Sequence, residues 1–358
     1  MILAAKPIIG DDEREAVDRV LRSGMLAQGP EVAAFEEEFS KFAGGYKCVA
    51  VNSGTSALHM ALVAADIKAG DEVIVPSFTF AATANSVALT GATPVFVDID
   101  PRTFNIDPAA IEAAITPKTK AIQPVHLYGQ PAQMDKIQEI AKKHSLLILE
   151  DAAQSHLATF NGQYVGSFGI AGTFSFYPTK NMTSGEGGMI SCATDEFARI
   201  CKLLRNQGME KRYENEIVGF NTRMTDIHAA IGRAQLAKVE EWTKARQRNA
   251  KFLNENLSGV ITPYLIPNAV HVYHQYTIRV TGHNRVKFAE EMTKRGVGNG
   301  VYYPIPVHEL PSFKSKLDLP NTTAACNEVI SIPVHPSLTQ QDLETVVEVI
   351  NTIANAGA

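Results

Sequence analysis

The middle of the chain alternates short apolar runs with segments of helical periodicity, from about residue 46 to residue 195. This alternation is typical of α/β proteins, and crossovers long enough to hold a helix favour parallel strands. We expect buried strands at Lys47–Asn52, Asp71–Pro76, Thr93–Val97, Ala121–Val125, Leu146–Glu150, Gly172–Phe176 and Gly188–Cys192. Helices are predicted at Ser56–Ala65 and Pro131–His144. Ligands gather at the carboxyl ends of such strands, so chemistry is sought there first.

The pattern changes after Asp226, where a long polar helix, roughly Ile227–Asn256, is predicted as a bridge. Beyond it the periodicity predicts a strand at Tyr273–Val280 and helices at Val286–Arg295 and Leu338–Ala354. These elements would form a smaller α+β domain. We therefore predict a large domain with an N-terminal arm over residues 1–245 and a small domain over residues 246–358.

Charge and cysteine usage exclude several classes of protein. The 358 residues carry a formal net charge of −5, which gives no basic surface for a nucleic acid. The four cysteines lack the spacing of metal ligands, so no metal site is predicted and reduced thiols are expected. The N-terminal apolar stretch is too short for a signal peptide, and no run approaches the roughly 18 to 20 apolar residues of a membrane helix. We expect a cytoplasmic protein.

Lys180 lies in a polar, glycine-rich loop, FYPTKNMTSGEGG, between the predicted strands Gly172–Phe176 and Gly188–Cys192. Strands on both sides would hold its amine in one place, as imine catalysis requires, because the amine must reach one carbonyl carbon repeatedly. The amine must also be neutral to attack. Most lysines are simply solvated, so the position alone does not identify a catalytic residue. The neighbouring motifs are needed to decide.

A hydrophobic strand delivers Glu150 and Asp151 at its carboxyl end, in SLLILEDAAQSH. A carboxylate at such a place can meet a cationic heterocycle. Pyridoxal 5'-phosphate (PLP) acts as an electron sink only while its ring nitrogen is protonated, and a partly buried carboxylate keeps that proton in place. Asp151 could equally cap the following segment, and the two roles are compatible.

The segment VAVNSGTSALHMALVAA predicts a strand, a turn of small residues and a helix. The backbone N–H groups of Gly54 and Thr55, together with the positive end of the helix, would form a site for a phosphate dianion. The segment matches neither the loop of nucleotide hydrolases nor the dinucleotide-binding turn, so it predicts neither ATP nor NAD. Phe78 and Phe80 follow the next strand, where either could cover a flat cofactor or pack in the core.

As a set, these motifs resemble a known family, the DegT/DnrJ/EryC1/StrS aminotransferases. The resemblance is carried by SGTSALHMAL, PSFTFAATANSV, ATPVFVDIDP, VHLYGQPAQMD, EDAAQSH, FSFYPTKNMTSGEGG and GFNTRMTDIHAA, in order from about residue 20 to residue 310. It implies a fold type I, aspartate aminotransferase-like large domain, the cofactor PLP and its amino form PMP, and the synthesis of amino sugars or aminocyclitols. It also implies a homodimer with shared active sites.

The resemblance also assigns roles to residues. Lys180 matches the imine lysine, which also carries the proton, and Asp151 matches the partner of the ring nitrogen. The implied cofactor contacts are the phosphate ligands Gly54, Thr55 and Ser175, Gln154 near the phenolic oxygen, Phe80 as the stacking ring, and Asn221 from the neighbouring subunit. Candidate substrate contacts, several from the stretch VYYPIPVHEL, are Tyr302, Tyr303, His308, Arg223 and His156.

Two acceptors remain open, with glutamate or glutamine as the expected donor in a ping-pong reaction. One acceptor is a nucleotide-linked keto sugar, and the other is a free keto cyclitol such as a scyllo-inosose-like ring. A nucleotide diphosphate would need additional cations, which Lys211, Arg212 and Arg223 could supply. The sugar is favoured because that branch of the family is larger.

Three other functions were weighed against transamination. PLP-dependent sugar dehydratases of this family carry a histidine at the position of the imine lysine, but this chain has Lys180. A non-catalytic regulator with the same fold would need neither Lys180 nor Asp151. A dinucleotide-dependent oxidoreductase would need a glycine fingerprint that is missing here.

Overall fold

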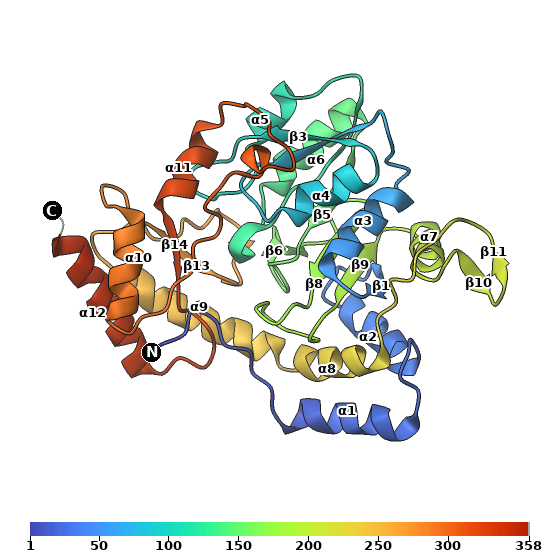
Figure 1. The fold of residues 1–358 in the computed structure, drawn as a ribbon, viewed down its shortest axis with the longest axis horizontal. Helices are drawn as coiled ribbons and strands as arrows, with labels where there is room; N and C mark the ends of the chain where they lie inside the picture. Colours follow the sequence, from blue (N-terminus) through green and yellow to red (C-terminus); the bar gives the residue numbers. More distant parts are fainter. Residues whose placement is uncertain (357–358) are drawn as a thin grey trace.

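The computed structural model describes residues 1–356 and is built around a seven-stranded sheet with the order β1-β9-β8-β5-β4-β2-β3 (Figure 1). Its strands are β1 (Lys47–Val51), β2 (Glu72–Pro76), β3 (Thr93–Val97), β4 (Thr119–Ile122), β5 (Leu147–Asp151), β8 (Ala171–Ser175) and β9 (Gly188–Cys192). All the predicted strands of this region are present, with ends displaced by a few residues at most. The predicted α/β class with a mostly parallel central sheet is confirmed.

One strand breaks the parallel order. Strands β3, β2, β4, β5 and β8 run parallel, whereas β9 is antiparallel to both β8 and β1. The segment between β8 and β9 contains no helix, so the chain turns back along its neighbour instead of crossing over. Lys180 lies in this segment, beyond the carboxyl end of β8.

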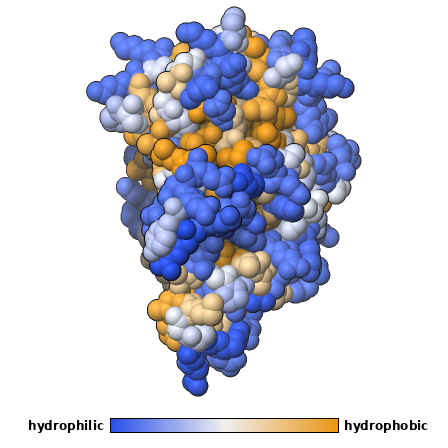
Figure 2. Space-filling view, turned by 90° about the vertical axis from the view of Figure 1, so that its right-hand side faces the viewer, coloured by the Kyte–Doolittle hydropathy of each residue, from blue (hydrophilic) through white to orange (hydrophobic). Residues whose placement is uncertain are grey.

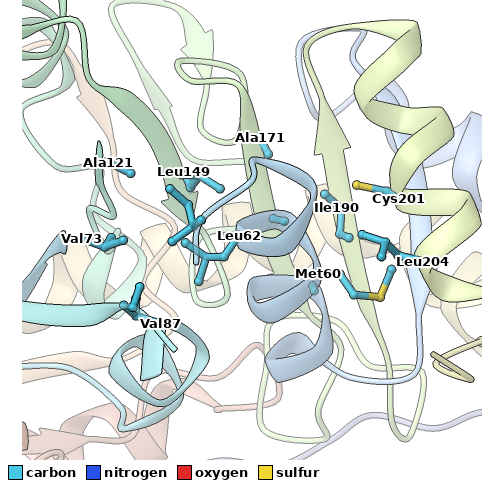
Figure 3. Close-up of a cluster of buried hydrophobic side chains, with 14 of the residues drawn as sticks. Met60, Leu62, Val73, Val87, Ala121, Leu149, Ala171, Ile190, Cys201 and Leu204 are labelled. Atoms are coloured by element: carbon cyan, nitrogen blue, oxygen red, sulfur yellow. The ribbon is translucent and has the colours of Figure 1, made fainter. Parts of the chain in front are cut away.

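A buried cluster fixes helix α3 (Gly54–Ala64) against the sheet. Figure 3 shows Met60 and Leu62 of this helix among Leu149 of β5, Ile190 of β9 and Leu204 of helix α7 (Asp195–Arg205). Burial of each side chain of this size contributes roughly 2 kcal/mol to the free energy of unfolding. The packing therefore holds the first turn of α3 near the carboxyl ends of β5 and β8.

Other helices complete the layers around the sheet. Helices α5 (Pro108–Ala113) and α6 (Met134–His144) pack on a second cluster that includes Ile122 and Ile148 of the sheet. The remaining helices before residue 100 are α1 (Asp11–Ser23), α2 (Pro30–Ser40) and α4 (Ala82–Leu89). Helix α2 packs on β1 and on helix α8 (Asp226–Leu236). No helix within residues 1–356 is both long and apolar enough to cross a membrane.

The predicted long helix Ile227–Asn256 is two helices, α8 and α9 (Val239–Asn256). The two helices are separated by Ala237 and Lys238, and the φ of Lys238 is −109°. The Lys238 amine lies 2.8 Å from both Asp12 Oδ2 and Glu13 Oε1 of α1. Glu13 is buried, and an unpaired carboxylate there would be costly, which favours the break over a continuous helix.

The C-terminal part has a hydrophobic cluster of its own, which includes Tyr276, Ile278, Phe288, Ile330 and Val346. It is built from α9, the antiparallel pair β13 (Tyr276–Arg279) and β14 (Val329–Ile332), and the helices α10 (Arg285–Lys294) and α12 (Gln340–Ala356). Helix α11 (Pro320–Glu328) precedes β14. The predicted strand and both predicted helices are found, and the boundary at residue 245, which stays a prediction, lies inside α9.

Two further small sheets lie outside the main sheet and the β13–β14 pair. The hairpin β10 (Met209–Lys211) and β11 (Glu214–Asn215) projects from the body beside α7 (Figure 1). The other sheet has the order β12-β6-β7, from Ala269–Val270, Thr159–Phe160 and Gln163–Tyr164. Figure 2 views the end of the molecule that carries the hairpin, where a band of hydrophobic surface crosses an otherwise hydrophilic face.

Candidate active site

A cavity of about 590 Å³ lies where the carboxyl ends of the strands meet the C-terminal part of the chain. Its walls come from the start of α3, the segment after β2, the ends of β5 and β8, the loop after β8, and residues near positions 274 and 302. The predicted site residues in the walls are Gly54, Thr55, Phe80, Asp151, Gln154, Ser175, Lys180, Tyr302 and Tyr303. A volume of this size is typical of small-molecule sites.

Lys180 lines this cavity with its amine in a poorly solvated environment. Burial lowers the pKa of Lys180 to about 8, although the negative charge of Asp151 opposes the shift. Its backbone N–H donates to the carbonyl oxygen of Tyr177 at 2.9 Å, which forms a turn after β8. A lysine with such a pKa is partly neutral near neutral pH, so its nitrogen can attack a carbonyl carbon.

Asp151 ends β5 and is almost fully buried. Thr83 Oγ1 donates to Asp151 Oδ2 at 2.9 Å, and the backbone N–H of Ala153 donates to Asp151 Oδ1 at 3.1 Å. Burial raises the pKa of Asp151, while the bonds from Thr83 and Ala153 and the charge of Lys180 act in the opposite direction. The two hydrogen bonds thus favour the ionised carboxylate that a protonated ring nitrogen requires.

The Thr83 hydroxyl belongs to a short chain of hydrogen bonds. Thr79 Oγ1 lies 2.9 Å from Thr83 Oγ1. A hydroxyl has one hydrogen, and Thr83 gives its hydrogen to Asp151, so Thr79 must be the donor to Thr83. The Thr83 carbonyl also accepts from Gln123 Nε2 at 2.9 Å. Thr83 is therefore held from both ends and presents its hydroxyl to Asp151.

The start of α3 offers two free backbone donors. The Ser53 side chain accepts from the N–H of Ser56 at 3.1 Å, which caps the helix. The N–H groups of Gly54 and Thr55 have no hydrogen-bond partner among residues 1–356. A Cβ on Gly54 would lie 2.7 Å from Ser175 Cβ, so only glycine lets the helix start approach the end of β8 so closely. This arrangement suits a phosphate group.

Gln154 and two aromatic rings complete the walls. Gln154 Oε1 accepts from the N–H of Tyr128 at 2.7 Å, and Gln154 Nε2 donates to the Tyr303 hydroxyl at 3.0 Å. Phe80 is 59% exposed and its ring lies 6.1 Å from that of Tyr303, whereas Phe78 is buried. Of the two phenylalanines considered from the sequence, Phe80 is therefore the one whose face is available to a flat ligand.

Two predicted histidines do not reach the cavity. His308 is fully buried, with Nδ1 2.6 Å from Ser77 Oγ and its ring against Phe96. His156 is enclosed by phenylalanine rings, including Phe174. Burial, reinforced by the charge of Lys180, lowers the pKa of His156 to about 3. Both histidines lie behind the site, in positions that the sequence pattern did not distinguish from the cavity wall.

The other predicted polar residues also lie outside the cavity of their own chain. Arg223 pairs with β1 through Val51 and donates to Asn206 Oδ1 at 2.9 Å. Asn221 is exposed beside this segment. Lys211 and Arg212 lie on the hairpin, where Lys211 is 3.6 Å from Glu214 and Arg212 stacks on Tyr213.

Sequence reasoning did not single out several polar residues of the site. Thr79, Glu186, His274 and Gln275 line the cavity, and Thr83 binds Asp151 from behind. Thr79 and Thr83 belong to the segment PSFTFAATANSV, and Glu186 belongs to TSGEGG, so both motifs contained the signal. His274 lies in VYHQYTIRV, which was interpreted only as a strand.

Comparisons with known proteins agree with this geometry. The model of the DegT/DnrJ/EryC1/StrS aminotransferase family matches residues 7–351. GDP-perosamine synthase of Caulobacter vibrioides is 42% identical over 364 residues, covering 98% of this chain and 98% of that protein. A pleiotropic regulatory protein of Geobacillus stearothermophilus is 42% identical over 344 residues, covering 93% and 92%. The structure of S. venezuelae DesV in complex with a ketimine intermediate has a TM-score of 0.92 at 37% identity, covering 96% and 94%.

Proposed function

This chain belongs to the DegT/DnrJ/EryC1/StrS aminotransferase family, and we propose that it transfers an amino group from glutamate or glutamine to a nucleotide-linked keto sugar. It is a PLP-dependent transaminase of keto sugars. The observation that carries the proposal is the placement of Lys180 and Asp151 in one cavity with the free amides of α3. Lys180 matches the carbonyl carbon of PLP, Asp151 matches its ring nitrogen, and the free amides match its phosphate group.

The residues present fit PLP. Lys180 would bind its carbonyl carbon, Asp151 its ring nitrogen, and Gly54, Thr55 and Ser175 its phosphate group. The close approach of Gly54 to Ser175 leaves the phosphate end narrow and lined by backbone donors. Phe80 would lie against the ring and Gln154 near the phenolic oxygen. When bound, PLP supplies the electron sink that stabilises a carbanion at the substrate carbon.

The side chains have separate tasks in each half of the proposed reaction. Lys180 would hold the carbonyl carbon of PLP through its neutral amine, give way to the incoming amino donor, and then carry the proton to or from the substrate carbon. Its pKa of about 8 suits both tasks, because the amine can hold and release a proton near neutral pH. Asp151 would lie beside the ring nitrogen as a carboxylate, which the hydrogen bond from the Thr83 hydroxyl stabilises.

A nucleotide-linked acceptor is favoured over a free keto cyclitol by the similarity to GDP-perosamine synthase. Among residues 1–356, the charged side chains that line the cavity are Lys180, Asp151 and Glu186. Lys180 and Asp151 are committed to the cofactor. A diphosphate would therefore need cations from outside this cavity, and Lys211 and Arg212 of the projecting hairpin are suitable in a dimer.

We further propose a homodimer in which Asn221 enters the partner's site. Asn221 is exposed and lies outside the cavity of its own chain. The segment before it exposes Ile217, Val218 and Phe220, with Val218 at 92%. This segment follows the hairpin at the end of the molecule in Figure 2, and exposed hydrophobic surface of this kind is typical of protein interfaces.

Subunit complementation tests the shared site. Lys180→Ala and Asn221→Ala chains, differently tagged and co-expressed, give a mixed dimer in which one site carries both lesions and the other carries neither. If Asn221 acts across the interface, one of the two sites is intact, so the mixed dimer should have about half of the wild-type activity per dimer. If Asn221 acts within its own chain, every site keeps one lesion and no activity returns.

The absorption spectrum tests the chemistry. Purified protein with PLP should show a visible band that shifts when L-glutamate or L-glutamine is added, and Lys180→Ala should lack that band. The amine-loaded protein is then offered keto sugars linked to GDP, UDP or dTDP and, separately, scyllo-inosose. Return of the original spectrum identifies the acceptor. A protein whose spectrum ignores every amino donor is not a transaminase.

A regulatory role is the alternative raised by the similarity to a pleiotropic regulatory protein. A regulator would not need a lysine whose pKa burial lowers to about 8, because such an amine costs stability and serves no structural contact. We also place the reaction in the cytoplasm, which agrees with four free cysteines, all of them buried within residues 1–356.

A further inference from the structure

The histidines around the active site differ in whether a ring nitrogen is available. His126 uses both nitrogens: Nδ1 accepts from the N–H of Ala132 at 3.0 Å, and Nε2 lies 3.0 Å from Glu150 Oε2. Both nitrogens of His156 and Nε2 of His308 are enclosed without a partner, so no ligand can reach them. These three histidines are structural.

His274 differs from the other three. It lines the cavity, and its Nδ1 lies 3.3 Å from Asn181 Oδ1. Its Nε2 makes no hydrogen bond to residues 1–356 and is not among the enclosed atoms. The residue itself is more than nine-tenths buried, and it borders both the candidate active site and a small neighbouring cavity of about 20 Å³.

The hydrogen bonds of Asn181 fix the tautomer of His274. Asn181 Nδ2 donates to the carbonyl oxygen of Val272 at 3.1 Å, so Asn181 Oδ1 is the atom that faces the His274 ring. An amide oxygen only accepts, and therefore His274 Nδ1 carries the hydrogen. The lone pair of the neutral ring is then on Nε2, which makes Nε2 a hydrogen-bond acceptor directed to the ligand space.

The surroundings keep this ring neutral. Burial and the nearby positive charges of Lys180 and Arg246 hold the pKa of His274 well below its usual value, and His156 and His271 add to the effect. Arg246 lies against the backbone here, with Nη1 donating to the carbonyl oxygens of Tyr273 and His274 at 3.1 and 3.3 Å. His274 is thus a poor base at neutral pH but a competent hydrogen-bond acceptor.

We propose that His274 Nε2 accepts a hydrogen bond from the amino group in transfer, when the amine of the donor or of the amino sugar enters the cavity beside Lys180. This inference rests on the proposed function. A carboxylate at this position would favour the charged ammonium form, which cannot attack a carbonyl carbon. A neutral imidazole binds the uncharged amine without this penalty. His274 is therefore a substrate-binding residue that the reaction uses without changing its charge.

The two halves of the reaction, measured separately by stopped-flow absorbance on the PLP-loaded enzyme, test the proposal. The probes are L-glutamate in one half and, in the reverse of the other, GDP-perosamine or the amino sugar that the acceptor screen identifies. His274→Phe keeps the ring but removes both nitrogens, and should slow both half-reactions about tenfold, the effect of one lost hydrogen bond. The visible band and the affinity for PLP should not change. His274→Gln, whose amide oxygen can take the place of Nε2, should recover most of the rate.

His283→Phe is the matched control, because His283 lies outside the cavity with its ring against Phe288, and it should leave both half-reactions unchanged. If His274→Phe does not fold, Asn181→Leu provides the second test: it removes the acceptor of Nδ1–H and should slow both half-reactions by freeing the ring. The proposal is overturned if His274→Phe reacts at the wild-type rate, if His274→Gln is as slow as His274→Phe, or if only the sugar half slows, which would assign Nε2 to a sugar hydroxyl. Failure of the proposed function itself would appear earlier, as a wild-type protein without a visible band.

Discussion

The amine of Lys180 and the carboxylate of Asp151 line the same cavity, and each shifts the pKa of the other. Asp151 raises the pKa of Lys180, and Lys180 lowers that of Asp151, but burial outweighs both effects and favours the neutral form of each group. The two residues come from the end of β5 and the segment after β8, which are adjacent strands of the sheet. The burial of these two groups without a cofactor therefore costs stability, and their mutual attraction offsets only part of this cost.

Replacing Lys180 with methionine should stabilise the cofactor-free protein at pH 7. The pKa of Lys180 is lowered from 10.5 to about 8, so the folded state binds fewer protons than the unfolded state between these values. The cost is fully present below pH 8 and disappears as the pH rises toward 10.5. We expect the free energy of unfolding of Lys180→Met to exceed that of the wild type by roughly 2 kcal/mol at pH 7, after allowing for screening by cavity water. Urea unfolding at pH 7 and 10.5 measures this difference. Lys251→Met is the control, because Lys251 is exposed.

Capture of PLP by the cofactor-free protein should accelerate with pH up to about 8 and then level off. Only the neutral amine of Lys180 attacks, and below its pKa the neutral fraction rises tenfold with each pH unit. The growth of the visible band after mixing with PLP gives the rate. A profile that keeps rising toward pH 10 would mean that Lys180 retains the pKa of a solvated lysine.

Thr83→Val should weaken the binding of PLP by at least about tenfold, because a hydrogen bond to a charged group is worth more than one between neutral groups. Without the Thr83 hydroxyl, the pKa of Asp151 rises and its carboxylate is harder to keep ionised. The loss should therefore be larger at low pH, and Thr83→Ser should restore the affinity. Thr243→Val is the control, because the Thr243 hydroxyl is buried without a partner. Equal affinities for Thr83→Val and Thr243→Val would contradict this role.

The sequence predicted the sheet because its strands are buried on both faces and read as continuous apolar runs. It also predicted Lys180 and Asp151, since the ends of such strands are where side chains can meet a ligand. The residue pattern alone left Phe78 and Phe80 equivalent until the family resemblance selected Phe80, and it did not reveal His274, because burial and open space depend on packing between distant segments. The break between α8 and α9 was missed for the same reason: Lys238 contacts Asp12 and Glu13 of α1, more than 200 residues away.

Gly54→Ala should weaken the binding of PLP far more than that of pyridoxal, which lacks the phosphate. The new Cβ would lie 2.7 Å from Ser175 Cβ and 3.3 Å from Ser175 Cα, so the start of α3 must move away from β8. This displacement moves the free N–H groups of Gly54 and Thr55 out of line with a phosphate, but leaves Lys180 and Asp151 in place. We expect at least about a tenfold loss of affinity for PLP, as for the loss of charge-assisted hydrogen bonds, and little change for pyridoxal.

Gly10→Ala provides the comparison for that measurement, because Gly10 also lies at the start of a helix and its Cβ would meet nothing closer than 3.5 Å. Affinities come from titrating the cofactor-free proteins with each compound and following the visible band. If Gly54→Ala lost affinity for PLP and pyridoxal equally, the substitution would act through the fold as a whole. A selective loss for PLP would assign the start of α3 to the phosphate, since pyridoxal differs from PLP only in that group.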